Sequence, residues 1–198
     1  GYFVGGLVGQ NTSYSNIGNT TASYATGNVT GAYYVGGLVG YNTNSTVTNS
    51  YTGIKTSGVI TTKAGTVTGT TTTGYVGGLI GQNSSGAISG STASGDVVSS
   101  GDYTGGLIGQ NSSSTISNSN STGNVTATGK NYVGGLVGYN SSSTITGATA
   151  SGIVNGASYV GGLVGQNLTS SAISTSSASG DVTGTPGPVG GLAAHPPS

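Results

Sequence analysis

Residues 34–42, Tyr-Val-Gly-Gly-Leu-Val-Gly-Tyr-Asn, contain the pattern on which the whole chain is built. The central pentad, G-G-L-(V/I)-G, returns along the sequence, and its leucine stands at Leu7, Leu38, Leu79, Leu107, Leu136 and Leu163. A degraded copy, GGLAA, has its leucine at Leu192. Most copies lie about 28 residues apart, a period typical of proteins made of stacked repeats. We therefore interpret the sequence as a tandem array of one short unit.

Alignment on the pentad leucine shows that each unit repeats the same side chains in the same places. Valine, replaced once by threonine, stands three residues before the leucine, and valine or isoleucine follows it directly. An aromatic residue stands four positions before it, at Phe3, Tyr34, Tyr75, Tyr103, Tyr132 and Tyr159. An asparagine stands four positions after it, at Asn11, Asn42, Asn83, Asn111, Asn140 and Asn167. Further β-branched residues follow in each unit, represented by Ile17 and Val29 in the first.

These columns favour strands over helices, because β-branched residues alternate with Gly, Asn and Ser and no stripe of helical period occurs. Each unit reads as three short strands joined by turns. In a parallel stack, equivalent residues would lie about 4.8 Å apart. Valine and isoleucine would stack inside, tyrosine would form an aromatic stack, and asparagine would form an amide ladder at a corner with left-handed backbone. The sequence predicts an all-β fold, a parallel β-solenoid (β-helix) of about six to seven coils with about 28 residues per coil.

The direction of the pentad leucine stays open at this point. Strict alternation puts the valines on one face of the strand and the leucine and tyrosine on the other. Either the Gly-Gly pair forms a bulge that returns the leucine to the interior, or the Leu–Tyr face packs against another protein. We favour the bulge.

The repeat also suggests the domain organisation. Residues 1–192 form the solenoid, with an insertion near 50–63, and residues 193–198 form a Pro-rich C-terminal tail. The insertion carries Lys55 and Lys63, and we expect a protruding loop or an extra hairpin there. A tolerated insertion and a binding element remain alternatives.

The recurring GGLVG or GGLIG core, with its accompanying Tyr, Asn and Val columns, resembles the GLUG motif. That repeat occurs in bacterial surface and secreted proteins, including adhesins and some IgA-specific peptidases. The resemblance covers nearly the whole chain, from Gly5 to Leu192. It implies a β-solenoid stalk or scaffold at the bacterial surface, and it brings no catalytic residues onto this sequence.

The composition excludes several classes of function. Only 3% of the 198 residues are charged, Lys+Arg and Asp+Glu number 3 each, and cysteine is absent. A nucleic-acid surface needs clustered Lys and Arg, and thiol chemistry, disulfides and thiolate-bound metals need cysteine. No apolar run approaches the roughly 20 residues of a membrane-spanning helix. We therefore expect no nucleic-acid partner and no membrane span.

The few ionisable side chains form no catalytic or metal-binding pattern. Asp96 and Asp181 share one column but would lie about 14 Å apart at the coil rise, too far for a pair of glycosidase carboxyls. His195, which a Ser-His-Asp site would need, lies in the Pro-rich tail. A calcium-binding solenoid needs an aspartate in every repeat, whereas this column also contains Thr66 and Ile153. We expect a protein that is not an enzyme and has no catalytic site, no metal site and no cofactor.

Several asparagines of the asparagine column also begin N-x-(S/T) sequons, at Asn11, Asn83, Asn111, Asn140 and Asn167. These positions are interpreted as the ladder column followed by Ser-rich turns, and N-glycosylation is the alternative.

The ends of the array suggest how it is used. Neither end shows the cap that solenoids need to cover their open strand edges, so the chain is either a segment of a longer solenoid or a subunit whose ends stack on other copies. Near-zero net charge removes the repulsion between copies, and a head-to-tail contact that does not close produces filaments.

We therefore expect a non-enzymatic extracellular or cell-surface protein of a bacterium, or alternatively an archaeon, that stacks end to end into a fibre or sheath. Its main partner would be other copies of itself, in a head-to-tail homo-oligomer or filament, with contacts to the cell surface or to glycans as a further class. One alternative is a stalk or scaffold segment of a bacterial surface adhesin. Another is a solenoid that binds glycans through its tyrosines or ice through its threonines.

Overall fold

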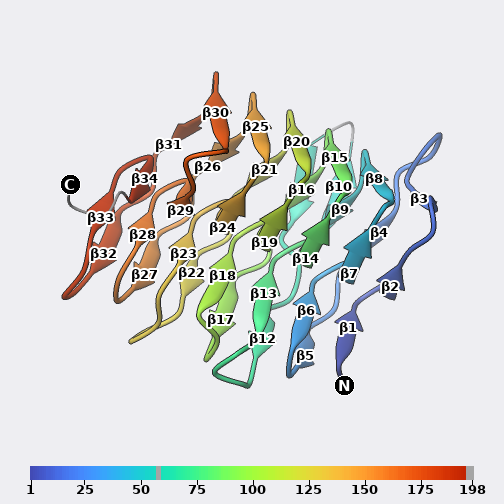
Figure 1. Ribbon diagram of the computed structural model, residues 1–198. Coiled ribbons are helices and arrows are strands. Elements are labelled where there is room, and N and C mark those ends of the chain that lie inside the picture. The colour runs from blue at the N-terminus through green and yellow to red at the C-terminus, as the bar shows by residue number, and fades with distance from the viewer. Residues whose placement is uncertain (57–58, 195–198) are drawn as a thin grey trace.

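The chain forms one continuous solenoid of short parallel strands (Figure 1). The computed structural model describes residues 1–56 and 59–194. We number the coils 1 to 7 after their pentad leucines, from Leu7 in coil 1 to Leu192 in coil 7. Coils 1 to 6 each contribute one strand to five parallel sheets, and coil 7 contributes to the first two sheets only. The all-β parallel solenoid that the repeat predicted is confirmed.

Sheets 1 and 2 carry the two halves of the pentad region. Sheet 1 consists of β1 (Phe3–Gly5), β6 (Tyr34–Gly36), β13 (Tyr75–Gly77), β18 (Tyr103–Gly105), β23 (Val133–Gly134), β28 (Val160–Gly161) and β33 (Val189–Gly190). Sheet 2 consists of β2 (Val8–Asn11), β7 (Val39–Thr43), β14 (Ile80–Ser84), β19 (Ile108–Ser112), β24 (Val137–Ser141), β29 (Val164–Asn167) and β34 (Ala193–Ala194).

Sheets 3 to 5 complete each coil. Sheet 3 consists of β3 (Asn16–Ile17), β8 (Thr46–Thr48), β15 (Ala87–Ser89), β20 (Thr115–Ser117), β25 (Thr144–Thr146) and β30 (Ala172–Ser174). Sheet 4 consists of β4 (Tyr24–Ala25), β9 (Tyr51–Thr52), β16 (Thr92–Ala93), β21 (Asn120–Ser121), β26 (Thr149–Ala150) and β31 (Ser177–Ala178). Sheet 5 consists of β5 (Val29–Gly31), β12 (Val67–Gly69), β17 (Val97–Ser99), β22 (Val125–Thr126), β27 (Val154–Gly156) and β32 (Val182–Gly184).

Each full coil has five short strands in the parallel sheets, whereas the sequence suggested three. A bend divides the first expected strand at the second glycine and the leucine of the pentad, as at Gly37 and Leu38. An additional two-residue strand, such as β16, follows the sheet 3 strand of each coil and precedes its sheet 5 strand. Two residues are too few to show the alternation by which a strand is recognised in a sequence.

The bend answers the open question about the pentad leucine. Leu38 is fully buried, and so are Val35 and Val39 on either side of the bend. The Leu38 carbonyl accepts the N–H groups of both Leu7 and Val8 of coil 1, each at 3.0 Å. Because two successive residues share one acceptor, the side-chain alternation is interrupted and both side chains enter the core. The leucine is therefore interior, and the interruption is a bend between sheets 1 and 2.

The three glycines of the pentad are required because backbones approach closely at this bend. A Cβ atom on Gly36 would lie 1.9 Å from a carbonyl oxygen of its own coil. A Cβ on Gly37 would lie 2.2 Å from a carbonyl oxygen of the next coil, and one on Gly40 would lie 2.6 Å from a carbonyl oxygen of the preceding coil. Backbone carbonyls held in sheets cannot move away without losing hydrogen bonds. The regular recurrence of these glycines along the chain thus has a steric cause.

Two stacks of apolar side chains fill the interior. One joins the pentad leucines to β-branched residues of sheets 2 and 3, and the other joins the valines of sheets 1 and 5. Leu79 and Leu107 in the middle of the array are 0% exposed, whereas Leu7 and Leu192 in the outermost coils are 50% and 42% exposed. The pentad leucines of the outermost described coils are therefore partly exposed, whereas those within the array are enclosed by their neighbours.

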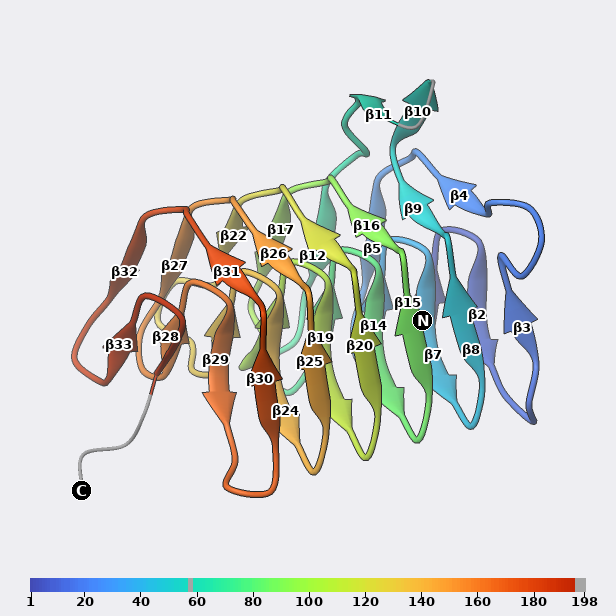
Figure 2. The same cartoon turned by 90° about the horizontal axis from the view of Figure 1, so that it is seen from above.

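The insertion in coil 2 forms an antiparallel hairpin of β10 (Ile54–Thr56) and β11 (Val59–Thr62), which projects from the solenoid (Figure 2). The coil path is held on both sides of the hairpin. The Gly53 N–H donates to the Ala25 carbonyl at 2.9 Å, and the Gly65 N–H donates to the Thr26 carbonyl at 2.8 Å. The hairpin is therefore added at one corner without displacing the strands of sheets 4 and 5.

At the C-terminal end, the structure describes Ala193–Ala194 as β34. His195, considered above as a catalytic histidine, and the following Pro196 and Pro197 lie outside the described residues.

Candidate functional site: the side-chain ladders

The asparagines of sheet 2 form a hydrogen-bonded ladder along the axis. Each Nδ2 group donates to the Oδ1 atom of the asparagine in the next coil, at 2.7 to 2.9 Å. The ladder joins Asn11, Asn42, Asn83, Asn111, Asn140 and Asn167. All of these bonds run in the same direction along the chain. The ladder therefore has an acceptor end at coil 1 and a donor end at coil 6.

The ladder lies at the end of a strand and not in the left-handed corner that the sequence suggested. Asn42 belongs to β7, and its Nδ2 group also donates to the Ser45 carbonyl across the turn, at 3.0 Å. Left-handed backbone occurs two residues after the ladder position, at Asn44 with a φ of 49° and at Ser85 with a φ of 53°. The buried amide satisfies both its axial neighbours and the backbone of the turn, as buried polar groups generally require.

The same burial bears on the sequons. The amides of Asn83, Asn111 and Asn140 are 0% exposed and are hydrogen-bonded to the coils on both sides. A glycosylating enzyme cannot reach a side chain that is enclosed in a folded coil. The structure therefore supports the ladder, and not sugar attachment, as the role of these three residues.

The aromatic residues of sheet 1 form a second ladder on the outer surface. Successive ring centroids lie 5.0 to 5.2 Å apart, with interplanar angles of 10 to 23°. The stack runs through Phe3, Tyr34, Tyr75, Tyr103, Tyr132 and Tyr159. Across the bend, sheet 2 presents Tyr41 at 5.3 Å from the Tyr34 ring and a Gln82–Gln110 side-chain bond of 2.7 Å.

This stacking limits what the aromatic ladder can bind. A sugar that packs on an aromatic ring needs a free ring face, but each inner ring has a parallel neighbour on both faces. An inner tyrosine such as Tyr103 is only partly exposed, and it presents its ring edge and its hydroxyl group to solvent. The geometry thus disfavours recognition of glycans by stacking on this column.

The environment of the ladder changes the acidity of its hydroxyl groups. Burial raises the pKa of Tyr34, Tyr103 and Tyr132 above the ordinary value of 10.0. Neighbouring ladder tyrosines raise the pKa further, because a second phenolate at this spacing would be repelled by the first.

We expect alkaline pH to destabilise the fold through this ladder. Because the folded pKa values lie above that of an unfolded tyrosine, the contribution of the ladder is complete below about pH 10 and is lost as the pH rises through the folded values. Urea unfolding from about pH 9 to about pH 12, followed together with tyrosinate absorbance, measures this loss. The variant Tyr103→Phe keeps the ring stack and should show a weaker pH dependence. A free energy of unfolding that stays constant over this range would contradict the prediction.

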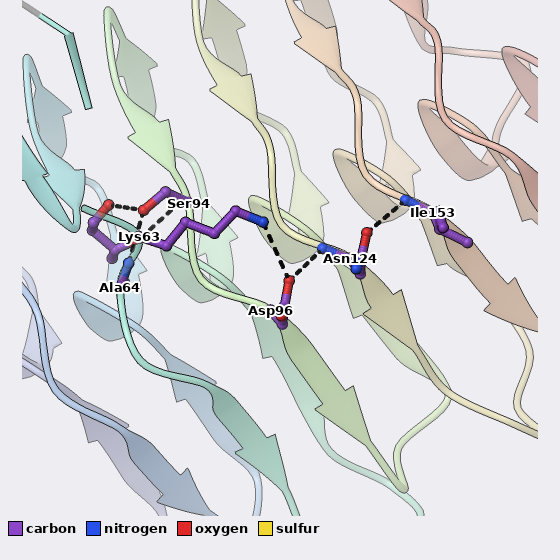
Figure 3. Close-up of polar contacts among 7 residues, drawn as sticks. Lys63, Ala64, Ser94, Asp96, Asn124 and Ile153 are labelled. Carbon is purple, nitrogen blue, oxygen red and sulfur yellow. Dashed lines mark hydrogen bonds and ion pairs between the residues drawn. The ribbon is translucent and has the colours of Figure 1, made fainter. Parts of the chain in front are cut away.

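A third ladder, which the sequence did not reveal, runs along the corner before sheet 5 (Figure 3). The Asp96 carboxylate accepts the backbone N–H of Asn124 at 2.8 Å, and the Asn124 side chain accepts the N–H of Ile153 at 3.0 Å. The Lys63 ammonium lies 3.9 Å from the Asp96 carboxylate. Asp102 likewise accepts a backbone N–H of the next coil, at 3.0 Å. Both carboxylates therefore have structural partners in the coil that follows them.

Serines at two further corners link the coils in the same way. The Gly86 N–H donates to the Ser114 hydroxyl at 3.0 Å, and the Ser114 hydroxyl donates to the Ser112 carbonyl at 2.6 Å. At the next corner, the Ser91 N–H donates to the Ser119 hydroxyl at 3.1 Å. Each hydroxyl thus joins its own turn to the turn of the preceding coil.

Ser121 is an exception, and we expect its replacement by alanine to stabilise the protein. Its buried hydroxyl has no hydrogen-bond partner in the described part of the chain, and its paired neighbours in sheet 4 are Ala93 and Ala150. Because an unpaired buried hydroxyl is costly, Ser121→Ala should raise the free energy of unfolding by about 1 kcal/mol. Urea denaturation checks this, with Ser114→Ala as the matched control that should lower it by about 1 kcal/mol. A loss of stability in Ser121→Ala would show that its hydroxyl is satisfied in solution.

Ionisable side chains are not gathered into a site in the described residues. No group of three or more His, Asp or Glu side chains there could hold a metal ion. Asp96 and Asp181 stand next to Val97 and Val182, which lie in coils 3 and 6 of sheet 5. The described part of the chain also has no helix of the length and apolar character needed to cross a membrane. The regular features of the described surface are instead the ladders of neutral side chains that repeat from coil to coil.

The repeats match one known family. The family model described as "The GLUG motif" matches residues 31–53, 72–98, 100–126, 129–155 and 156–183, which is more than half of the chain. No curated protein and no solved structure gives a significant match. The matched segments begin in the loop before sheet 1 or close to it, so that each covers about one coil.

Proposed function

The chain belongs to the GLUG-motif family and has the fold of a repeat structural protein, and from this premise we propose that it is a non-enzymatic subunit of an extracellular fibre or sheath. In this proposal, the coils of one copy continue onto the coils of the next copy, head to tail, at the surface of the cell that makes it. The ladders give this role a physical basis because each of them repeats along the axis.

The direction of the asparagine ladder is the observation that carries the proposal. Coil 1 presents the Oδ1 acceptor of Asn11 along the axis, and the Nδ2 group of Asn167 stands at the donor end. A head-to-tail copy brings donor to acceptor, whereas a two-fold arrangement would bring like to like. Contacts of this kind do not close and therefore grow into filaments.

The end faces are also suited to each other in polarity. Leu7 of coil 1 is 50% exposed, and Val189 and Leu192 of coil 7 are 45% and 42% exposed. A new coil 1 can meet coil 6 in all five sheets only if it displaces β33 and β34, which have two residues each, and Leu7 of the new copy then takes the place of Leu192 on coil 6. The formal net charge of zero leaves no general repulsion between copies.

Sedimentation velocity of the purified chain over a range of concentrations tests the proposal. The natural sequence should form species that grow with concentration. Leu7→Lys places a charge in the end contact and should stay monomeric, because an unpaired charge in a contact between copies is costly. Tyr14→Lys is the matched control, since Tyr14 is 84% exposed at the side of coil 1, and it should assemble like the natural sequence.

Circular dichroism of both variants confirms that they remain folded. A natural chain that stays monomeric at every concentration would contradict the fibre and favour the passive stalk of a surface adhesin. Assembly of Leu7→Lys to the same extent as Tyr14→Lys would contradict the end contact.

A further inference from the structure

The corner between sheets 2 and 3 contains a pocket that none of the ladders explains. It has a volume of about 400 Å³ and extends over coils 1 to 4. The residues that line it include Tyr14 of coil 1, Asn44 of coil 2, Ser85 of coil 3, and Ser113 and Thr115 of coil 4. The pocket therefore runs along the axis, across successive coils, and not within one of them.

A row of free polar side chains follows this corner. Asn44, Ser85 and Ser113 are exposed, and their left-handed backbone is fixed by N–H bonds of 3.0 Å to the carbonyls of the following coil. Among the described residues, none makes a hydrogen bond with these three side chains. Equivalent positions in successive coils repeat at about 4.8 Å. The row thus offers unused donors and acceptors at a regular spacing on a fixed backbone.

Tyr14 stands at one end of the row with a free ring. Its side chain is 84% exposed, and its backbone N–H donates to the Asn44 carbonyl at 2.9 Å. Coil 1 has one residue more than coil 2 between the ladder asparagine and the core residue of sheet 3, which is Ile17 in coil 1 and Val47 in coil 2, so the turn that carries Tyr14 is longer. In the described residues no other ring contacts it, unlike the stacked tyrosines of sheet 1.

These features define the chemistry of a ligand. A free aromatic face packs on the C–H face of a sugar ring, and amides and hydroxyls bond to its hydroxyl groups. No charged side chain lines the pocket among the residues described, so a charged polymer would find no counter-ion. We propose that this corner binds a neutral, extended polysaccharide, whose sugar rings follow the axis at a spacing close to the coil rise, with one ring packed on Tyr14. This site goes beyond the fibre contact and does not depend on it.

Isothermal titration of the full chain with cellohexaose and with chitohexaose tests the proposal, since both are neutral, extended oligosaccharides. At least one should bind saturably. Tyr14→Ala should weaken that binding by about tenfold. Thr115→Trp, which fills the pocket, should weaken it as well. Tyr24→Ala is the matched control, because Tyr24 is also an exposed tyrosine, at 55%, but lies on sheet 4, and its binding should equal that of the natural sequence.

Three results would overturn the proposal. The first is that neither hexasaccharide binds. The second is that Tyr14→Ala binds as tightly as Tyr24→Ala. The third is that an acidic hexagalacturonate binds as tightly as the neutral probes, because the pocket would then not select for neutral ligands.

Discussion

Replacing Gly78 by alanine is expected to lower the free energy of unfolding by about 3–5 kcal/mol. A Cβ atom at this position would lie 2.1 Å from the carbonyl oxygen of Gly106 in the next coil. That oxygen belongs to the backbone, so a rotating side chain cannot relieve the overlap. The two coils would have to separate at the bend, which would also disturb the fully buried Leu79.

Urea denaturation of Gly78→Ala measures this loss. Gly27→Ala is the matched control, because no atom lies within 4 Å of a Cβ built on Gly27. The control should be as stable as the natural sequence or slightly more stable, since alanine restricts the unfolded chain. Equal stability of the two variants would mean that the glycines of the pentad do not have the steric role assigned to them.

Replacing Asn111 by aspartate is expected to make stability strongly dependent on pH. The ionised carboxylate of this variant can still accept the Nδ2 bond of Asn83, but it cannot donate to the Oδ1 atom of Asn140, and two oxygens then face each other in a buried site. A protonated carboxyl group can donate its O–H there and restore the ladder. The variant should therefore lose about 3 kcal/mol or more at neutral pH, where a buried charge is left uncompensated.

The sign of the pH effect follows from linkage. Burial and the facing oxygen raise the folded pKa of the new carboxyl above its unfolded value of about 3.9. The stability of the variant is therefore fully present below that value and is lost as the pH rises through the folded pKa. Urea unfolding at about pH 3 and about pH 7 measures the difference. Asn118→Asp is the control, because Asn118 is exposed, and equal destabilisation of Asn111→Asp at both pH values would contradict the prediction.

Much of the solenoid could be predicted because the repeat occurs many times and each column keeps the same type of residue. The ladder asparagines and the stacked aromatics follow from spacing alone, since parallel stacking places each column along the axis. The number of strands in a coil could not be predicted from spacing, because Thr92–Ala93 in β16 and its equivalents are too short to show alternation. Alternation indicated an irregularity at the Gly-Gly pair that returns the leucine to the interior, but it could not give the form of the bend at Gly37 and Leu38, which depends on one carbonyl that accepts two N–H groups.

The polar ladders were also predicted only in part. The asparagine ladder was predicted, but the prediction of left-handed backbone at the ladder position was wrong, since the turn is reached only at Asn44. The column that contains Asp96 and Asn124 is rich in Asp and Asn, whose side chains accept backbone N–H groups of the next coil. This composition was the signal for the third ladder, and spacing alone did not reveal it. The pocket beside Tyr14 could not be predicted, because it is lined by turn residues of four coils, whose side-chain arrangement does not follow from the spacing of the repeat.

The shortage of charge has a physical explanation in this architecture. Equivalent side chains lie about one strand spacing apart, roughly 4.8 Å, and like charges at that distance repel each other. Burial is the main cause of the raised pKa of Tyr103 and Tyr132, and repulsion between neighbouring phenolates raises it further in the same way. Neutral Asn, Ser, Thr and Tyr can repeat without this cost. The composition therefore fits a chain whose properties come from repetition.

Electron cryomicroscopy of the purified chain at high concentration tests the central claim most directly. We predict filaments in which the five sheets and the asparagine ladder continue across the boundary between copies at the strand spacing of about 4.8 Å. Dispersed particles of single-chain size, or copies joined only through their sides, would contradict it.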